Sequence, residues 1–120
     1  MNSVLNNQTN GGKMRNEIFI LGSARTAIGT FGGSLSGISP IELATSVSKA
    51  AIQRSKINAS DIGHVAFGHV INTEPKDMYL SRVAALNAGI SNAAPAMNVN
   101  RLCGSGLQAI VSVFQTLMME

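Results

Sequence analysis

The last third of the chain carries almost no charge, and this feature limits the possible folds more than any other. Between Val83 and Glu120 the charged residues are Arg101 and the terminal glutamate. In a chain that is 12% charged and 45% apolar, such a segment is expected to lie in a protein interior. Residues 102–119 approach the length of a membrane span, but their glycine, serine, glutamine and threonine residues make them too polar for lipid. We therefore expect a buried element and no membrane.

Composition excludes several classes of protein. A length of 120 residues fits one domain, and a single cysteine excludes a disulfide framework and leaves no zinc-binding spacing, so no metal site is expected. Nine basic and six acidic residues give a net charge of +3, but the basic residues are scattered, so nucleic acid is not an expected partner. Residues 1–15 are polar, rich in asparagine and without the apolar core of a signal peptide. We expect a flexible tail in this segment and a cytoplasmic protein.

Segments typical of strands and helices alternate three times along the rest of the chain. This order predicts an α/β fold with at least some parallel strand pairing, and residues 16–120 are expected to form one domain. The expected elements are a strand over 17–21, a helix from 40, a strand over 64–71, a helix over 77–88, a strand over 95–100 and a helix from 103.

Two of the expected helices have clear signatures. Ser39, Pro40 and Glu42 match the cap, first-turn proline and returning glutamate of a helix start. The last helix is apolar on one face and uncharged on the other, so it is expected to be buried all round. Its apolar face consists of Leu107, Ile110, Val111, Phe114, Leu117 and Met118. Because a helix buried on both sides needs more layers than these elements supply, we expect the chain to be the front portion of a larger protein.

The residues around Cys103 place one cysteine between an expected strand and two glycines that open an uncharged helix. The attacking form of cysteine is the thiolate, which the positive end of a helix dipole stabilises. Free N–H groups in the first helical turn can donate hydrogen bonds to an oxyanion, and glycines let a substrate approach the backbone closely. A lone cysteine is most often a small buried apolar residue. This turn, comparable to a nucleophile elbow, instead favours Cys103 as a nucleophile, with Gly104, Ser105 and Gly106 as candidate substrate contacts.

The same turn also matches a different function. Gly104 to Ala109 fits the G-x-G-x-x-A fingerprint of dinucleotide-binding folds, and it follows a strand and opens a helix. The fingerprint normally lies on the first strand–helix turn, whereas this is the third, and the acidic residue expected about 20 positions later falls beyond Glu120. A nucleotide-binding module is therefore one alternative to a nucleophilic enzyme. An inactive chain that serves as an interaction partner is another.

Two distant stretches carry a family resemblance. Val99 to Leu117 resembles the acyl-enzyme signature of the thiolases, in which an asparagine and two free positions precede the cysteine, and a small residue, serine and glycine follow it. Ser23 to Gly33 is similar to the loop after that family's first strand, and Arg82 to Leu86 and Pro95 to Asn100 lie in the family's order and spacing. The resemblance covers residues 17–120 and is to the amino-terminal part of the acetyl-CoA acetyltransferase and 3-ketoacyl-CoA thiolase group.

This resemblance implies a fold and an activity. The fold is a thiolase-like half-fold of β-α-β-α-β-α order, with a mixed sheet and a buried helix that carries the nucleophile. Cys103 matches the residue that takes an acyl group from acyl-CoA, and its backbone N–H matches a donor to the oxyanion. The carbanion of a second acetyl-CoA then attacks the acyl-cysteine to give a 3-ketoacyl-CoA, and the degradative direction reverses these steps. The family takes CoA thioesters as substrates, uses no metal or redox cofactor, and forms dimers or tetramers.

Three features depart from the complete family pattern. The base histidine and second cysteine of the family match nothing in these 120 residues, so we expect the chain alone to be inactive. His64 and His69 match no catalytic position and are expected to be structural. Asn72 to Tyr79 resembles bacterial β-ketothiolases that accept longer acyl chains more than it resembles the acetyl-specific members.

Overall fold

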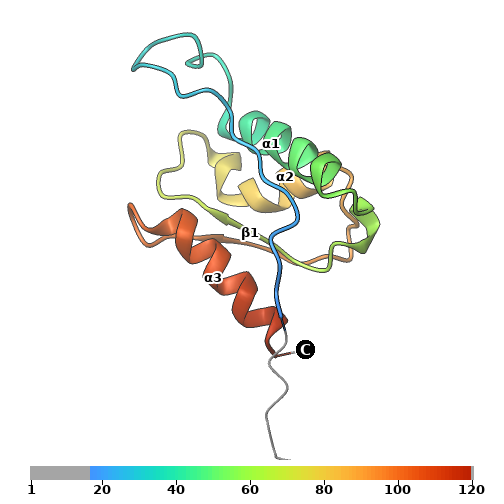
Figure 1. The fold of residues 1–120 in the computed structure, drawn as a ribbon. Coiled ribbons are helices and arrows are strands. Elements are labelled where there is room, and N and C mark those ends of the chain that lie inside the picture. The colour runs from blue at the N-terminus through green and yellow to red at the C-terminus, as the bar shows by residue number, and fades with distance from the viewer. Residues whose placement is uncertain (1–16, 120) are drawn as a thin grey trace, which may run out of the picture.

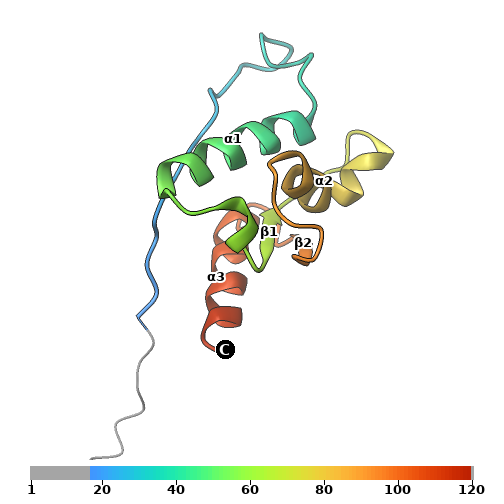
Figure 2. The ribbon, with the colours of Figure 1, turned by 90° about the vertical axis from the view of Figure 1, so that its right-hand side faces the viewer.

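The computed structural model describes residues 17–119, so the predicted tail over 1–15 lies outside the described residues. Figure 1 shows two of the helices, α1 and α2, on one side of the strands and the third helix, α3, on the other side, and the turned view in Figure 2 agrees. In chain order the elements are α1 (Pro40–Ser55), η1 (Ala59–Asp61), β1 (Val65–Gly68), η2 (Pro75–Tyr79), α2 (Leu80–Asn87), β2 (Ala96–Val99) and α3 (Ser105–Leu117), where η denotes a 3₁₀ helix.

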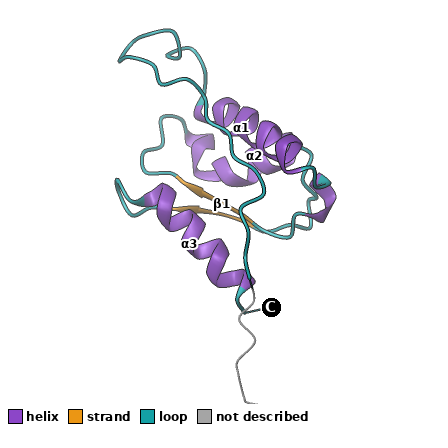
Figure 3. Cartoon of the chain, in the orientation of Figure 1, coloured by secondary structure: helices purple, strands orange, loops and turns teal. Residues whose placement is uncertain are grey.

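The two strands form a small parallel sheet between the helices (Figure 3). Val65 of β1 lies opposite Ala96 of β2, and Gly68 lies opposite Val99 at the other end of the pairing. The N–H of His69 donates to the Val99 carbonyl at 2.9 Å and continues the pairing beyond β1. The predicted α/β class and parallel pairing are confirmed. The sheet over residues 17–119 has no antiparallel strand, so it is not the mixed sheet that the resemblance implied.

The expected strand over 17–21 is not formed. The segment, blue in Figure 1, runs extended across the molecule without strand pairing, and Phe19 and Ile20 are largely exposed. The next residues lie against α1, because the Arg54 guanidinium donates to the Ser23 carbonyl at 2.6 Å. An apolar run becomes a strand only where a neighbouring strand pairs its backbone, and this segment has no such neighbour within the described residues.

The start of α1 agrees with the prediction. The Ser39 hydroxyl accepts the Glu42 N–H at 3.2 Å, and the Glu42 carboxylate accepts the Ser39 N–H at 2.8 Å, which completes a capping box with Pro40 in the first turn. The helix buries Ile41 and Ala44. These side chains pack against Leu80 and Ala84 of α2.

The second helix begins differently from the prediction. The chain enters it through η2, in which Asp77 is fully buried, and α2 itself begins at Leu80. The Oδ2 atom of Asp77 accepts the Thr73 N–H at 2.8 Å, the Thr73 hydroxyl at 2.7 Å and the Glu74 N–H at 2.9 Å. This carboxylate therefore caps η2 rather than α2. Gly89 follows the helix with a φ of 88°, as expected of a glycine stop.

Asn98 of β2 takes over the capping of α2. Its Oδ1 accepts the Ser81 N–H at 3.0 Å, and its Nδ2 donates to the carbonyls of Met78 at 3.0 Å and Asp77 at 3.3 Å. First-turn N–H groups of a helix have no partner within the helix, so a side chain from a neighbouring strand can satisfy them. One amide thereby fixes the start of α2 against the strand that leads to Cys103.

The core lies on either side of α2, where small residues let the neighbouring elements approach closely. Ala84 is fully buried and packs with Ile41 and Ala44 of α1. Ala85 is 1% exposed and packs with Val65 of β1. A helix with adjacent alanines can therefore contact a helix on one side and a sheet on the other.

The third helix differs from the prediction in its start and in its burial. It begins at Ser105 rather than at Cys103, and within residues 17–119 its buried positions are Ser105 and Ala109. One side packs on β1 and β2, but Leu107 is 70% exposed and Ile110 is 58% exposed, because no element of this part of the chain covers the rest of the helix. None of the helices over 17–119 combines the length and the apolar character needed to cross a bilayer.

Candidate active site

Cys103 lies in the turn that joins β2 to α3. The strand ends at Val99 and the helix begins at Ser105, so residues 100–104 make the connection. The Cys103 side chain is exposed and carries a free thiol. Cys103 directly precedes Gly104, which is the N-cap of a 13-residue helix, and the positive end of that helix dipole stabilises a nearby thiolate. The predicted order of strand, cysteine and helix is confirmed.

Backbone strain in this turn is concentrated at Leu102, whose φ is 51°. The left-handed conformation costs a residue with a Cβ about 1–2 kcal/mol. Gly104 has a φ of −87°, which any residue can adopt, so this turn does not need the conformational freedom of that glycine. Strained residues of this kind persist only where the surrounding structure enforces them, and they cluster at functional sites.

Hydrogen bonds account for all but one of the backbone N–H groups from Arg101 to Ser105. Of the five from Arg101 to Ser105, four donate within the turn: Arg101 to Ser105 Oγ at 2.9 Å, Leu102 to Asn100 Oδ1 at 3.0 Å, Gly104 to the Arg101 carbonyl at 3.1 Å, and Ser105 to the Leu102 carbonyl at 3.0 Å. The Cys103 N–H makes no hydrogen bond to any residue of 17–119. A free backbone N–H beside an exposed thiol is a suitable donor for an oxyanion hole.

The three residues after Cys103 are placed differently from one another. Ser105 is 4% exposed, and its hydroxyl accepts the Arg101 N–H and donates to the Leu102 carbonyl at 2.6 Å. Gly104 and Gly106 are exposed. A Cβ at Gly106 would meet no atom within 4 Å, so the approach to the first turn of α3 is open at that residue.

Gly68, the last residue of β1, is a site residue that the sequence analysis missed. A Cβ on Gly68 would lie 2.6 Å from the Gly106 nitrogen and 2.6 Å from the carbonyl carbon of Ser105, closer than real atoms pack. The missing side chain therefore lets α3 begin directly against the end of the sheet. A glycine at the end of a strand is the signal that could have indicated this close approach.

No acid–base partner of Cys103 is found among residues 17–119. His69 Nε2 lies 2.8 Å from Asn72 Oδ1, and His64 Nε2 is buried without a hydrogen bond in this part of the chain. The described residues also contain no group of three or more metal-ligating side chains. The candidate site over these residues therefore consists of an exposed thiol and backbone donors, and the structural role of both histidines stays a prediction.

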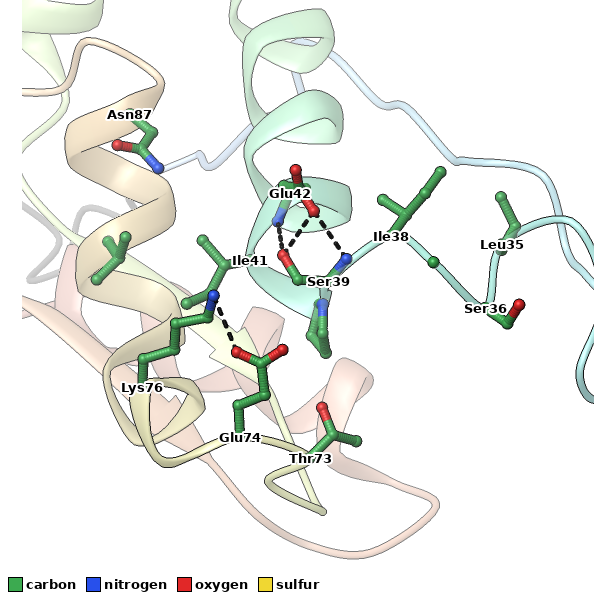
Figure 4. Close-up of a pocket in the computed structure, with 13 residues that line it drawn as sticks. Leu35, Ser36, Ile38, Ser39, Ile41, Glu42, Thr73, Glu74, Lys76 and Asn87 are labelled. Carbon is green, nitrogen blue, oxygen red and sulfur yellow. Dashed lines mark hydrogen bonds and ion pairs between the residues drawn. The ribbon is translucent and has the colours of Figure 1, made fainter.

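A polar groove of about 830 Å³ lies between the loop before α1 and the segment around η2 (Figure 4). Its charged side chains bond to one another or to the backbone, since Glu42 accepts the Ser39 N–H and Lys76 pairs with Glu74 at 2.9 Å. The Ser39 N–H lowers the pKa of Glu42, and the Glu74 carboxylate raises the pKa of Lys76. No residue of the Cys103 turn lines this groove, so we do not assign it to the candidate active site.

An apolar groove of about 790 Å³ does border the candidate site. Gly68 and Gly106 line it together with Phe67, Ile110 and Phe114. The extended residues 18–20 also contribute to its lining. Apolar surface is thus continuous from the first turn of α3 along the exposed side of that helix.

Comparison with known proteins assigns the chain to a family. The family model described as the N-terminal domain of thiolase matches residues 18–120. The chain belongs to the thiolase family. This membership decides against the dinucleotide-binding interpretation of Gly104 to Ala109, and it confirms the resemblance that the cysteine signature indicated.

Among its thiolase relatives, beta-ketothiolase BktB of Cupriavidus necator is 56% identical over 106 residues, which cover 88% of this chain and 27% of that protein. Acetyl-CoA acetyltransferase of the same organism is 38% identical, over 85% of this chain and 26% of that protein. Human mitochondrial 3-ketoacyl-CoA thiolase in complex with CoA superposes with a TM-score of 0.83 at 33% identity, over 85% of this chain and 26% of that one. The chain therefore spans about a quarter of the length of the thiolases that it matches.

Proposed function

We propose that this chain supplies the nucleophile of a thiolase-type acyltransferase, with Cys103 forming an acyl-thioester intermediate. The observation that supports this most directly is the free N–H of Cys103 beside its own exposed thiol, while the other four N–H groups from Arg101 to Ser105 are bonded. One residue then supplies both the nucleophile and a hydrogen-bond donor to the oxyanion. A thioester carbon that reaches the sulfur of Cys103 brings its carbonyl oxygen near this donor.

The first half-reaction transfers the acyl group to Cys103. The thiolate attacks the carbonyl carbon of an acyl-CoA, and the carbonyl oxygen becomes an oxyanion that accepts the Cys103 N–H. Collapse of this adduct breaks the bond between the acyl carbon and the sulfur of CoA, and the departing CoA thiolate takes up a proton. One thioester replaces another, so the step is readily reversible.

The second half-reaction forms or cleaves a carbon–carbon bond. A base removes a proton from C2 of acetyl-CoA, the resulting carbanion attacks the acyl carbon, and the Cys103 sulfur leaves as a thiolate to release a 3-ketoacyl-CoA. Cleavage runs the same steps in reverse. Since residues 17–119 place no base in contact with Cys103, we propose that thiolase residues outside this stretch supply it, and that residues 1–120 alone are inactive.

The similarity to thiolases supports a proposal for the substrates of the site and for what covers it. The identity to beta-ketothiolase BktB supports a β-ketothiolase. We propose that it takes acyl-CoA and acetyl-CoA and uses no metal, redox cofactor or nucleic-acid partner. We further propose that the exposed apolar side of α3 is covered in the full-length protein, by the rest of a thiolase fold and by a second subunit of a homo-oligomer. The proposed location is the cytoplasm.

Turnover by the full-length protein tests this function. We expect release of CoA when acetyl-CoA is the substrate, and loss of that release in Cys103→Ala, because no other cysteine is present in these residues. Arg101→Lys changes an exposed residue of the same turn and serves as a control that keeps the thiol. A Cys103→Ala variant that releases CoA at the wild-type rate would contradict the proposal. Tight binding of NAD without binding of CoA esters would instead support a nucleotide-binding module.

A further inference from the structure

The hydroxyl of Ser105 bonds to the strained residue of the Cys103 turn, Leu102, and to the residue before it. It accepts the N–H of Arg101 at 2.9 Å and donates to the carbonyl of Leu102 at 2.6 Å. The peptide group between Asn100 and Arg101 and the peptide group between Leu102 and Cys103 are thus tied to a single oxygen atom. Their relative orientation is set by the φ and ψ of Arg101 and Leu102, so this oxygen helps to hold Leu102 in its left-handed conformation.

Ser105 is too buried for its hydroxyl to contact a substrate at Cys103. Ser105 is 4% exposed, and its hydroxyl both accepts from and donates to backbone groups of its own turn. A substrate that reaches the exposed Cys103 would meet Gly104 and Gly106 rather than this side chain. The sequence suggested Ser105 as a substrate contact, whereas its geometry suits a support for the turn.

Loss of the hydroxyl would have a specific consequence. Leu102 would retain the cost of its left-handed conformation, about 1–2 kcal/mol, but would lose two of the bonds that hold it there. The N–H of Arg101 would also be left without its partner in the turn. Relaxation of Leu102 rotates the next peptide, and that peptide contains the N–H of Cys103.

We propose that Ser105 is a positioning residue, whose buried hydroxyl holds Leu102 in the left-handed conformation so that the N–H and the sulfur of Cys103 face the same thioester. This inference rests on the proposed function, because it assigns Ser105 to the acyl transfer at Cys103. Ser105 acts through the backbone and touches no reacting atom.

Two probes of Cys103 in the full-length protein test the proposal. Acetyl transfer from acetyl-CoA to Cys103 develops an oxyanion, whereas alkylation by iodoacetamide displaces iodide and develops none. In Ser105→Ala we expect the rate of acetyl transfer to fall about 10²-fold, as for other small misplacements of catalytic groups. Alkylation of Cys103 should stay within a few-fold of the wild-type rate. A general loss of structure would change both rates together.

Rescue and control variants sharpen this test. Ser105→Thr keeps a hydroxyl and should acylate faster than Ser105→Ala. Adding Leu102→Gly to Ser105→Ala should raise the rate of acetyl transfer at least tenfold above that of Ser105→Ala alone, because glycine adopts a positive φ without strain. This double variant also relieves strain if Ser105→Ala folds poorly. Ser112→Ala removes a hydroxyl from the same helix that bonds the Gln108 side chain, and it should leave both rates unchanged.

Three results would overturn the inference. Wild-type acetyl transfer in Ser105→Ala would show that the hydroxyl is not needed. An equal fall in acetylation and alkylation, without rescue by Leu102→Gly, would show a purely structural role. Absence of any acetyl group on Cys103 in the wild-type protein would overturn the proposed function as well, and it is distinguished from the other two results because the wild type itself then fails.

Discussion

Gly68 lies so close to Gly106 that one methyl group on Gly68 would come within 2.6 Å of the Gly106 nitrogen. The end of β1 and the first turn of α3 are therefore in backbone contact, although they are far apart in the sequence. Ligand sites of α/β proteins lie beyond the carboxyl ends of the strands, and both strands end at the side where Cys103 lies. The contact sets how near to the sheet the cysteine turn can sit.

Replacement of this glycine tests the contact. We expect Gly68→Ala in the full-length protein to lower the free energy of unfolding by about 1–3 kcal/mol, as for other insertions into packed sites. The new methyl group would press on the backbone of α3, which has less freedom to yield than a side chain. Chemical denaturation measures this difference.

A matched glycine provides the control. A Cβ at Gly63, just before β1, would meet no atom within 4 Å, so Gly63→Ala should change stability far less. Equal stabilities of the two variants would contradict the close approach at Gly68.

Asn98 offers a second test of how the strands position the helices. Asn98→Ala removes the acceptor of the Ser81 N–H and the donor to the Met78 carbonyl. We expect a loss of about 1–3 kcal/mol in the free energy of unfolding, because the N–H of the buried Ser81 is left without its partner. Thermal or urea unfolding would measure it.

Asn87 supplies the comparison for that variant. It lies at the exposed end of α2 and makes no side-chain hydrogen bond within residues 17–119. Asn87→Ala should therefore leave the unfolding midpoint near the wild-type value. A loss as large as that of Asn98→Ala would show that the amide of Asn98 has no special role.

The hydrogen bonds to the Asp77 carboxylate lead us to expect a specific dependence of stability on pH. The Thr73 hydroxyl, followed by the N–H groups of Glu74 and Thr73, lowers the pKa of Asp77 from its ordinary value of 3.8, against the opposing effect of burial. A carboxyl whose pKa is lower in the folded state contributes stability that is complete above its unfolded pKa. That contribution is lost as the pH falls through the lowered folded pKa.

Asp77→Asn removes this titration. We expect the unfolding midpoint of the variant to fall less steeply than that of the wild type as the pH is lowered from neutral to below 3.8. Asp61→Asn changes an exposed carboxylate in η1 and serves as the matched control. Parallel curves for the wild type and Asp77→Asn would contradict the assigned hydrogen bonds.

Short sequence motifs predicted the parts of this fold that depend on residues close together in the sequence. The capping box of Ser39 and Glu42 lies within one helical turn, so its residue types alone indicate the start of α1. The place of Cys103 between a strand and a helix could be predicted in the same way. The helix expected over 77–88 instead begins at Leu80, because Asp77 belongs to a 3₁₀ turn that precedes α2 and bonds to Thr73.

Features that depend on distant or competing contacts could not be predicted in this way. Leucine disfavours a positive φ, so nothing about Leu102 itself indicates the conformation that the Ser105 hydroxyl favours. The contact of Gly68 with α3 joins two elements whose packing the sequence does not show. The run over 17–21 has the pattern of a strand, but strand formation also requires a neighbouring strand, which the described residues do not provide.

The most direct test of the central claim is the mass of the Cys103 peptide after brief exposure of the full-length protein to acetyl-CoA. We predict one acetyl group on Cys103, its removal when free CoA is added, and no such modification in Cys103→Ala. A Cys103 peptide that stays unmodified while the protein turns over acetyl-CoA would contradict the assignment of Cys103 as the nucleophile.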